Sequence, residues 1–464
     1  MFALYDALWV LTFLCLWPYW GWRHLASQKY RRTLPQRLGI LTANTGWPPG
    51  NDLPGPPRIW IHAVSVGEVM AAKGLIANLD RLLPNHALVL STTTKTGQEL
   101  ARSTLPQVKA FLYMPFDLRW CVGRAVDAIR PEVAIVMETE LWPNLFRLLH
   151  NSGARIIVAN GRISPRSFPR YRRLRPLMAR LLAPIDLFAA QSEADAQRIA
   201  AIGLDPGKIT VTGNIKFDQA TRIPGPKEMA PLREKLGLSP TPPHPSSEAS
   251  ERSPRSSPPD PTLPPIWVAA STHPGEETTI LEAHSQLRKR WPDLRLVLVP
   301  RHPERAESIA AIAGPAHGSM QTGCLFFSRE CRHWTNQTLI VDQIGWLNRL
   351  YGLARFAFIG GSLVPHGGQN LLEAAAWSIP SLIGPHMFNF REPTNAILAA
   401  NGAIQIDSAD SLVRAADSLL DDPALCQTMG HNARETISRH TGALDRTLAA
   451  IHRLANTGND RPPS

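Results

Sequence analysis

From Arg58 onward, the chain alternates between short apolar runs rich in β-branched residues and longer amphipathic stretches. The first series of apolar runs occupies 59–65, 87–93, 133–139, 155–161, 186–192 and 209–215. Stretches with helical periodicity, such as 68–83 and 193–202, lie between these runs. Strands that alternate with helices in this way predict a parallel sheet with helices on both faces.

A proline- and serine-rich segment at 239–265 interrupts the alternation. It holds ten prolines and seven serines in 27 positions, with almost nothing that could be buried. This composition predicts a disordered linker or an inserted surface loop. The alternation then resumes, and the last stretch, 408–455, is helical in pattern throughout. The second series of apolar runs occupies 266–272, 295–301, 339–344, 356–362 and 380–385.

Two such series in 464 residues predict two α/β domains, because one compact core does not grow to this size. We place an N-terminal Rossmann-like domain at 34–225 and a C-terminal Rossmann-like domain at 266–464. Ligands of open parallel sheets bind beyond the carboxyl ends of the strands. We therefore expect the two sheets to face a central cleft that holds the functional site.

The N-terminal segment at 1–33 combines an apolar run at 7–17 with an aromatic cluster and a basic flank. A signal peptide would carry its charge before the apolar run, so this arrangement excludes one. Aromatic rings and basic side chains both favour the lipid headgroup region, so we predict a membrane anchor or interfacial helix. A buried core helix is the alternative. The basic flank would leave the rest of the protein in the cytoplasm.

The net charge and the cysteines indicate which kinds of partner and of stabilising site to expect. The net charge of +11 favours an anionic partner, such as a phosphorylated lipid, a membrane surface or a nucleotide. The five cysteines are odd in number and form no CxxC pair. This argues against a disulfide framework and against a cysteine-based zinc site.

Carboxylates and one lysine follow predicted strands of the first half. Glu68 follows the strand at 59–65 and opens a helix, where it could act in chemistry or only cap the helix. Glu138 and Glu140 end another strand, and their spacing of two predicts side chains on one face. Lys216 stands at a third strand end, where its cation could face a developing negative charge. There is no Asp-x-Asp motif, and we predict no metal and no cofactor.

In the second half, Arg301 and His302 stand at a strand end. A glycine-rich turn within 360–375 runs into a helix near Asn370, with Glu373 on the first turns of that helix. Such a loop suits a phosphate held by backbone N–H groups and a helix dipole. The pattern thus predicts a nucleotide-phosphate site in the second domain.

Together these segments resemble the ordered blocks of the Kdo transferases, with METELWPN the most specific. These enzymes move 3-deoxy-D-manno-octulosonic acid (Kdo) from CMP-Kdo onto lipid A precursor in lipopolysaccharide synthesis, and they have the GT-B fold. The match covers nearly the whole chain apart from 239–265 and the extreme C-terminus. The blocks are HAVSVGE (62–68), METELWPN (137–144), ANGRIS (159–164), TGNIKFD (212–218), STHPGEE (271–277), VPRHPER (299–305), GGSLVPHGGQNLLEAA (360–375) and GPHMFNF (384–390).

The resemblance implies an inverting transfer to lipid IVA, with Glu68 as the general base and with Glu138 and Lys216 stabilising the transition state. It also implies CMP-Kdo, lipid A precursor and an anionic membrane surface as partners, at the cytoplasmic face of the inner membrane. No nucleic acid and no obligate protein partner are expected. The implied CMP-binding residues are Pro300, Arg301, Ile344, Gly345, Trp346, Asn370, Leu371, Leu372 and Glu373. The family usually has glutamate, histidine and proline where this chain has Trp346, Gln369 and Leu371, respectively.

Seven arginines and no acidic residue lie between Arg162 and Arg180, with Phe168 and Tyr171 among them. We interpret this run as a surface for lipid phosphates, with a solvated loop as the alternative. Two other functions were weighed: another GT-B enzyme that uses a UDP-sugar, as a transferase or an epimerase, and a non-catalytic membrane protein that binds nucleic acid. The arginines form one local run without a nucleic-acid-binding motif, which disfavours the second.

Overall fold

The computed structural model describes residues 33–41, 57–219, 223–238, 264–313, 323–329, 331–335 and 337–456, with seven further residues between Tyr5 and Cys15. The chain divides into two compact units. Unit 1 comprises Met1–Asp218 and Thr441–Ser464, and unit 2 comprises Gln219–His440. The predicted linker at 239–265 lies outside the described residues, apart from its last two positions.

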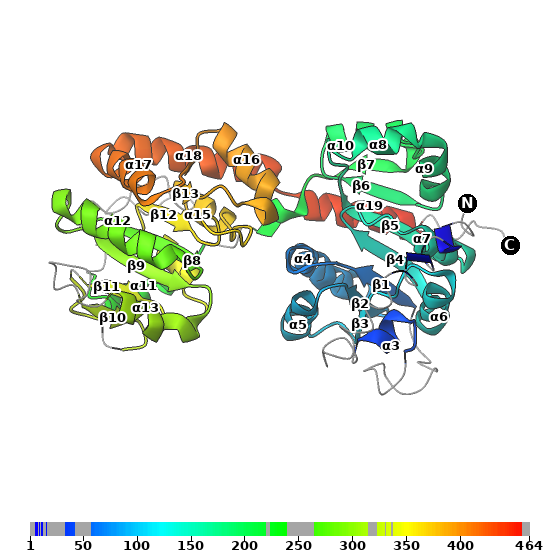
Figure 1. The fold of residues 1–464 in the computed structure, drawn as a ribbon, viewed down its shortest axis with the longest axis horizontal. Coiled ribbons are helices and arrows are strands. Elements are labelled where there is room, and N and C mark those ends of the chain that lie inside the picture. Colours follow the sequence, from blue (N-terminus) through cyan, green and yellow to red (C-terminus); the bar gives the residue numbers. More distant parts are fainter. Residues whose placement is uncertain are drawn as a thin grey trace. The chain divides into compact units, whose positions relative to one another are not determined.

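Unit 1 is built on a seven-stranded parallel sheet in the order β3-β2-β1-β4-β5-β6-β7, with helices on both faces (Figure 1). Its strands are β1 (Arg58–His62), β2 (Ala87–Thr92), β3 (Ala110–Tyr113), β4 (Pro131–Met137), β5 (Arg155–Gly161), β6 (Leu187–Ala190) and β7 (Ile209–Val211). Its helices are α3 (Leu34–Arg37), α4 (Val66–Leu82), α5 (Lys95–Thr104), α6 (Arg119–Ile129), α7 (Pro143–Asn151), α8 (Phe168–Arg173), α9 (Arg175–Leu182), α10 (Glu193–Ala201) and α19 (Ala443–Asn456).

The central strand of this sheet is buried on both faces. Successive side chains of a strand point to opposite faces, and β1 is buried at all five positions. Ile59 and Ile61 belong to the same buried cluster as Leu75 of α4, whereas Trp60 belongs to a second cluster with Phe146 of α7. Each such apolar side chain stabilises the fold by about 1.5–3 kcal/mol when fully buried. This two-sided burial explains why the strand reads as a continuous apolar run.

The last helix of the chain, α19, belongs to unit 1. Leu448 and Ile451 are buried in the same cluster as β1. The carboxylate of Asp218 accepts hydrogen bonds from Gly442 N and Leu444 N, both 2.6 Å. The expected domain at 266–464 therefore ends too late, because the apolar face of α19 covers the sheet of unit 1.

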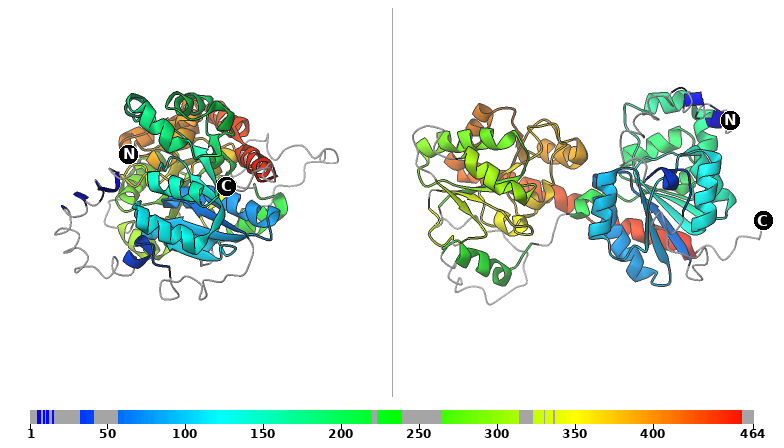
Figure 2. Two further views of the ribbon diagram at one scale, coloured as in Figure 1. Left: turned by 90° about the vertical axis from the view of Figure 1, so that its right-hand side faces the viewer. Right: turned by 60° about the horizontal axis from the view of Figure 1, so that its bottom comes forward.

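Unit 2 repeats the architecture with the order β10-β11-β9-β8-β12-β13-β14, again parallel. Figure 2 shows helices on both faces of each sheet. Its strands are β8 (Ile266–Thr272), β9 (Arg295–Pro300), β10 (Cys324–Phe326), β11 (Thr338–Ile340), β12 (Phe356–Ile359), β13 (Ser381–Ile383) and β14 (Ala403–Gln405). Its helices are α11 (Pro226–Lys235), α12 (Glu276–Arg290), α13 (Ala306–Ile312), α14 (Leu347–Tyr351), α15 (Leu372–Ala376), α16 (Arg391–Ala399), α17 (Ala409–Asp421) and α18 (Pro423–His440). The strand order reverses between β1 and β4 in unit 1 and between β8 and β12 in unit 2, which is where such sheets bind ligands.

The predicted membrane anchor at 1–33 falls mostly outside the described residues. Of its apolar run, the residues that are described are helical. Asp6 Oδ1 accepts a hydrogen bond from Asn144 Nδ2 (2.7 Å), and the ring of Trp9 lies 6.5 Å from that of Phe116. Among the described residues, no helix has the length and apolar character needed to cross a membrane. The described residues of this segment contact unit 1, and the membrane anchor or interfacial helix stays a prediction.

Candidate active site

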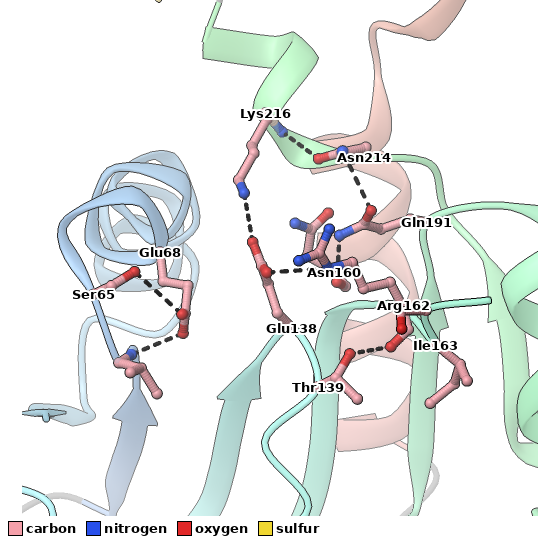
Figure 3. Close-up of polar contacts among 12 residues, drawn as sticks. Ser65, Glu68, Glu138, Thr139, Asn160, Arg162, Ile163, Gln191, Asn214 and Lys216 are labelled. Atoms are coloured by element: carbon pink, nitrogen blue, oxygen red, sulfur yellow. Dashed lines mark hydrogen bonds and ion pairs between the residues drawn. The ribbon is translucent and has the colours of Figure 1, made fainter. Parts of the chain in front are cut away.

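The three predicted catalytic side chains come together at the carboxyl edge of the unit 1 sheet (Figure 3). Glu68 is on the first turn of α4, which follows β1. Glu138 comes directly after β4, the neighbour of β1 at the reversal of strand order. Lys216 lies in a short 3-10 helix, Ile215–Gln219, which follows β7. Three distant segments thus converge on one edge.

Glu68 is held by its own loop and is mostly buried. Its Oε2 accepts a hydrogen bond from Val64 N (2.8 Å), and Ser65 Oγ donates to its Oε1 (3.3 Å). Burial, followed by the negative charge of Glu138, raises the pKa of Glu68 from 4.5 to about 7. Glu140 raises this pKa further, whereas the Val64 hydrogen bond and Lys216 lower it. A carboxylate with a pKa near neutrality can take up a proton during turnover, which an ordinary helix cap does not need.

Glu138 forms a nearly buried ion pair with Lys216. The Lys216 Nζ atom lies 2.6 Å from Glu138 Oε1, and both side chains are almost fully shielded from solvent. The Nε atom of Arg162 lies 3.5 Å from the other carboxylate oxygen. Glu138 also has a φ of +56°, a left-handed conformation that costs a residue with a Cβ of the order of 1–3 kcal/mol. The fold therefore holds this carboxylate in a strained position between two cations.

The argument that placed the side chains of Glu138 and Glu140 on one face of a strand was wrong. Alternation along a strand was expected to put both side chains on one face, but β4 ends at Met137, before either of them. The left-handed turn at Glu138 redirects the chain. Both carboxylates nevertheless lie close enough to Glu68 to raise its pKa. Burial raises the pKa of Glu140 itself.

A buried amide network holds the segment that carries Lys216. Asn214 Oδ1 accepts from Lys216 N (2.9 Å), and Asn214 Nδ2 donates to Gln191 Oε1 (3.3 Å). Gln191 Nε2 donates to the carbonyl of Asn160 (2.8 Å), whose side-chain oxygen accepts from Ile215 N (3.0 Å). Asn160, Gln191 and Asn214 are all nearly or fully buried. Sequence reasoning did not single out these amides, because only the fold joins the ends of β5, β6 and β7.

The predicted CMP-binding residues lie in unit 2, at the carboxyl ends of β9, β11 and β12. Pro300 ends β9, and Arg301 N donates to the carbonyl of Thr272 (3.0 Å), which brings the ends of β9 and β8 together. Asn370 Nδ2 donates to Glu373 Oε1 (3.2 Å), and burial raises the pKa of Glu373. Leu371 and Leu372 are fully buried. Only the backbone at these two leucines could therefore contact a nucleotide.

The loop that holds Ile344, Gly345 and Trp346 precedes α14. Ile344 is 87% exposed, and Gly345 has a φ of +94°. The ring of Trp346 packs against Phe327, with centroids 5.0 Å apart, and the guanidinium of Arg349 lies 5.3 Å from its centre. Trp346 is thus partly engaged by its neighbours within unit 2.

The first backbone N–H groups of the glycine-rich loop are bound within unit 2, and the predicted phosphate site in the rest of the loop stays a prediction. Glu276, which is fully buried at the start of α12, accepts hydrogen bonds from Gly361 N, Ser362 N and Leu363 N at 2.7–3.0 Å. It also accepts from His273 N (2.9 Å). The backbone N–H groups at 361–363 are therefore already used by a carboxylate. The helix that follows, α15, has only five residues and so has a weak dipole.

Glu276 and His273 were not among the predicted site residues. Glu276 has the same local placement as Glu68, on the first turn of the helix after the central strand, so its position was visible in the sequence. Its bonding to a loop 85 residues away was not. In the described part of the chain, no three His, Cys, Asp or Glu side chains are grouped so as to hold a metal ion.

A family model described as 3-deoxy-D-manno-octulosonic-acid transferase (kdotransferase) matches residues 32–219. A 3-deoxy-D-manno-octulosonic acid transferase from Haemophilus influenzae is 34% identical over 432 residues, which is 92% of each chain. The chain belongs to the Kdo transferase family. A second Kdo transferase, from Bordetella pertussis, is 31% identical over 93% of this chain and 94% of its own.

Membership of the Kdo transferase family makes this protein a glycosyltransferase. A solved glycosyltransferase from Rickettsia africae superposes with a TM-score of 0.51 over 88% of this chain and all of its own, at 13% identity. That likeness concerns the fold alone. It agrees with the predicted GT-B architecture of two parallel-sheet α/β domains. The predicted roles of the individual site residues stay predictions.

Proposed function

We propose that this Kdo transferase moves Kdo from CMP-Kdo onto lipid IVA, the lipid A precursor, and releases CMP. The observation that carries the proposal is Glu68, a mostly buried carboxylate with a pKa near 7 beside the Glu138–Lys216 ion pair. Two relatives that match over nine-tenths of their length are 3-deoxy-D-manno-octulosonic acid transferases. We infer the reaction from family membership, and these side chains can provide the proton acceptor and the charges that the reaction needs.

Glu68 is the general base in the proposed mechanism. The acceptor hydroxyl attacks the anomeric carbon of Kdo while the bond from that carbon to the phosphate oxygen breaks. The hydroxyl proton passes to Glu68, and the bonding electron pair leaves with CMP, so the anomeric configuration is inverted. Proton removal by a positioned carboxylate accelerates such a step by about 10²–10⁴-fold. The hydrogen bond from Val64 N orients the carboxylate.

Glu138 and Lys216 stabilise the transition state as one unit. Because they are 2.6 Å apart, neither charge acts independently of the other. Glu138 favours the cationic, oxocarbenium-like sugar, and Lys216 offsets negative charge on the departing phosphate or on the sugar carboxylate. Arg162 compensates Glu138 from the other side. Preorganised charges of this kind need no rearrangement when the transition state forms.

CMP is bound in this proposal by the predicted residues of unit 2. Arg301 supplies the charge in this proposal, because the N–H groups at 361–363 of the glycine-rich loop already bind Glu276. Asn370 and Glu373 are hydrogen-bonded to each other at the start of α15 and would contact the nucleotide as a pair.

We further propose that the enzyme works at the cytoplasmic face of the inner membrane through a surface of unit 1. This arginine patch comprises Arg162, Arg166, Arg170, Arg172, Arg173, Arg175 and Arg180, all of them exposed. Leu174 and Leu177 are also exposed among them, at 48% and 42%. Exposed apolar side chains within a basic surface suit the interface of an anionic bilayer, where both contribute to binding.

The test is mass spectrometry of the product formed by purified enzyme from lipid IVA and a panel of sugar nucleotides. We expect lipid IVA to gain one or more Kdo units with CMP-Kdo, and no sugar with UDP-sugars. Transfer or epimerisation of a UDP-sugar, with no product from CMP-Kdo, would favour the alternative GT-B function. An enzyme without Lys216 (Lys216→Ala) is the matched control for background transfer.

A further inference from the structure

Three histidines of unit 2 meet at the carboxyl edge of its sheet. His273 follows β8 and His302 follows β9, whereas His366 lies in the glycine-rich loop after β12. The strand order reverses between β8 and β12, so this is the ligand-binding position of the second sheet. We call His273, His302 and His366 the histidine cluster. None of its members is among the nine CMP-binding residues that the family resemblance implies.

Ring stacking and a hydrogen bond hold the histidine cluster in a defined arrangement. The rings of His273 and His366 are stacked, with centroids 4.4 Å apart, and the ring of His302 stands edge-on to His273 at 6.5 Å. Gln369 Nε2 lies 3.0 Å from His273 Nε2. When Gln369 donates this hydrogen bond, the imidazole carries its proton on Nδ1, which can then donate to a ligand.

The backbone is shaped to admit the His273 ring. Gly361 has a φ of +67°, and a Cβ there would lie 3.1 Å from the ring of His273. The Asn389 side chain donates to the carbonyl of His366 (3.1 Å), which fixes the loop on its other side. The loop is therefore held close against His273.

Positive charge in this region is only partly paired with acidic side chains. Burial and nearby positive charges lower the pKa of His273 from 6.5 to about 4, so the ring is neutral at pH 7. Those charges belong to His366, His302, Arg301 and Arg305. Glu304 pairs with His302 and Glu277 with Arg305. Among the described residues, no acidic side chain forms an ion pair with Arg301, His273 or His366. Arg301, together with the ring N–H donors beside it, favours an anionic ligand.

Among the described residues, Glu276 forms no ion pair with Arg301 or the histidine cluster. Both oxygens of Glu276 are occupied by backbone N–H groups of the glycine-rich loop and of His273. The same bonds prevent the N–H groups at 361–363 from binding an anion. Beside these three N–H groups, the side chains of the histidine cluster and Arg301 remain as donors for an anion.

The proposed donor carries two anionic groups on one atom. In CMP-Kdo the anomeric carbon bears both the phosphate oxygen and the sugar carboxylate, so the groups that bind these two anions must be adjacent. Arg301 is in the predicted CMP site, and its charge acts on His273 next to it. We propose that His273 and His366, with Gln369 orienting His273, bind the carboxylate of the donor sugar. This inference rests on the proposed function and names the part of the donor that CMP alone lacks.

The test compares the dissociation constants of CMP and CMP-Kdo, measured by calorimetry without acceptor on the full-length protein. We expect His273→Ala and His366→Ala each to weaken CMP-Kdo binding by about tenfold or more, the usual effect of losing a hydrogen bond to a charged group. CMP binding should change less than about twofold and so shows that unit 2 is folded. His273→Gln, which retains a neutral donor, should recover part of the loss. His431→Ala, at an exposed position on α18, is the control.

Three outcomes would overturn the inference. Unchanged CMP-Kdo affinity in both alanine variants would show that the two histidines do not bind the sugar carboxylate. Equal weakening of CMP and CMP-Kdo would assign the cluster to the phosphate instead. Wild-type protein that does not bind CMP-Kdo would refute the proposed function itself, and this inference with it.

Discussion

At the scale of single residues, the unusual property of Glu68 is its pKa. Its place after a strand and its hydrogen bond to Val64 N fit an ordinary helix start. What differs is the environment, because burial and two neighbouring carboxylates raise its pKa to about 7. Glu276 is the contrast within the same chain. Four backbone N–H groups satisfy it, and it has no oxygen left for chemistry.

The pH dependence of activity should follow Glu68. Because the base must be ionised, kcat/KM should rise with pH through a pKa of about 7. Glu140→Gln removes a negative charge that raises this pKa, so the rise should move to lower pH. The measurement is the pH profile of kcat/KM with CMP-Kdo and lipid IVA. Glu193→Gln, an exposed carboxylate at the start of α10, is the control and should leave the profile in place. A profile unmoved by Glu140→Gln would contradict the assignment.

The stability of unit 1 should also depend on Glu68. The folded-state pKa is above the ordinary value of 4.5, so folding disfavours the ionised form, and stability is lost as pH rises from about 4.5 to about 7. Glu68→Gln removes this loss. We compare the free energy of unfolding of the variant with that of the wild type at each pH. The variant-minus-wild-type difference should be more favourable to the variant above pH 8 than at pH 4, by on the order of 3 kcal/mol. Urea unfolding at the two pH values measures it, and an equal difference at both would refute the raised pKa.

Glu138 shows how far residue-level prediction reaches. Its chemical type and its place after an apolar run were enough to select it as a candidate. The expected direction of its side chain rested on strand alternation, which stops at Met137. The left-handed φ and the pairing with Lys216 depend on contacts 78 residues away in the chain, and no local pattern carries them.

At the scale of elements, the ends of neighbouring strands position the catalytic lysine. Asn214 is the direct support, since it accepts from Lys216 N and donates to Gln191. Asn214→Ala should lower kcat by roughly tenfold or more, because small displacements of catalytic groups have large effects. CMP affinity should not change, because CMP is assigned to unit 2.

The controls for this prediction separate positioning from simple loss of stability. Asn214→Asp retains the oxygen that accepts from Lys216 N and should recover part of kcat. Asn78→Ala removes an amide whose recorded bond is to Gly74 in its own helix, and it should leave kcat unchanged. If Asn78→Ala and Asn214→Ala lowered kcat equally, the positioning role would be excluded.

Sequence patterns predicted the central strands better than the edge strands. β1, β4 and β8 are buried at nearly every position and read as apolar runs. β3, β10 and β14 have only three or four residues, and none of them was predicted. A strand this short carries too few residues to show a period, although the edge strand β7 was predicted from the apolar run at 209–215. The glycine-rich loop was recognised correctly as a turn into a helix, but the use of its N–H groups by Glu276 depends on the tertiary fold.

At the scale of the whole molecule, the two-domain α/β organisation followed from the spacing of apolar runs, whereas the crossing of the last helix into unit 1 did not. The amphipathic pattern of α19 predicts that one face of the helix is buried, but it does not show which unit buries that face. The arginine patch is a second feature whose role the sequence does not decide. A run of arginines has the same sequence pattern on a solvated loop and on a lipid-binding surface.

The lipid-binding role of the arginine patch can be tested by charge reversal on α8. Arg170, Arg172 and Arg173 are exposed there. Changing all three to glutamate should weaken binding to vesicles containing an anionic phospholipid by more than about tenfold, since each basic residue contributes about 1 kcal/mol near such a surface. Lysine at the same positions keeps the charge and should retain binding. Vesicle co-sedimentation measures both, and unchanged binding of the glutamate variant would assign the patch to solvent.

The most direct measurement of the central claim is turnover by Glu68→Gln, made beside CMP binding by the same sample. The side-chain amide keeps the shape and the bond from Val64 N but cannot take a proton. We predict that kcat for Kdo transfer falls by about 10²–10⁴-fold while the CMP dissociation constant stays within about twofold. Substantial turnover by a variant that still binds CMP would show that Glu68 is not the base.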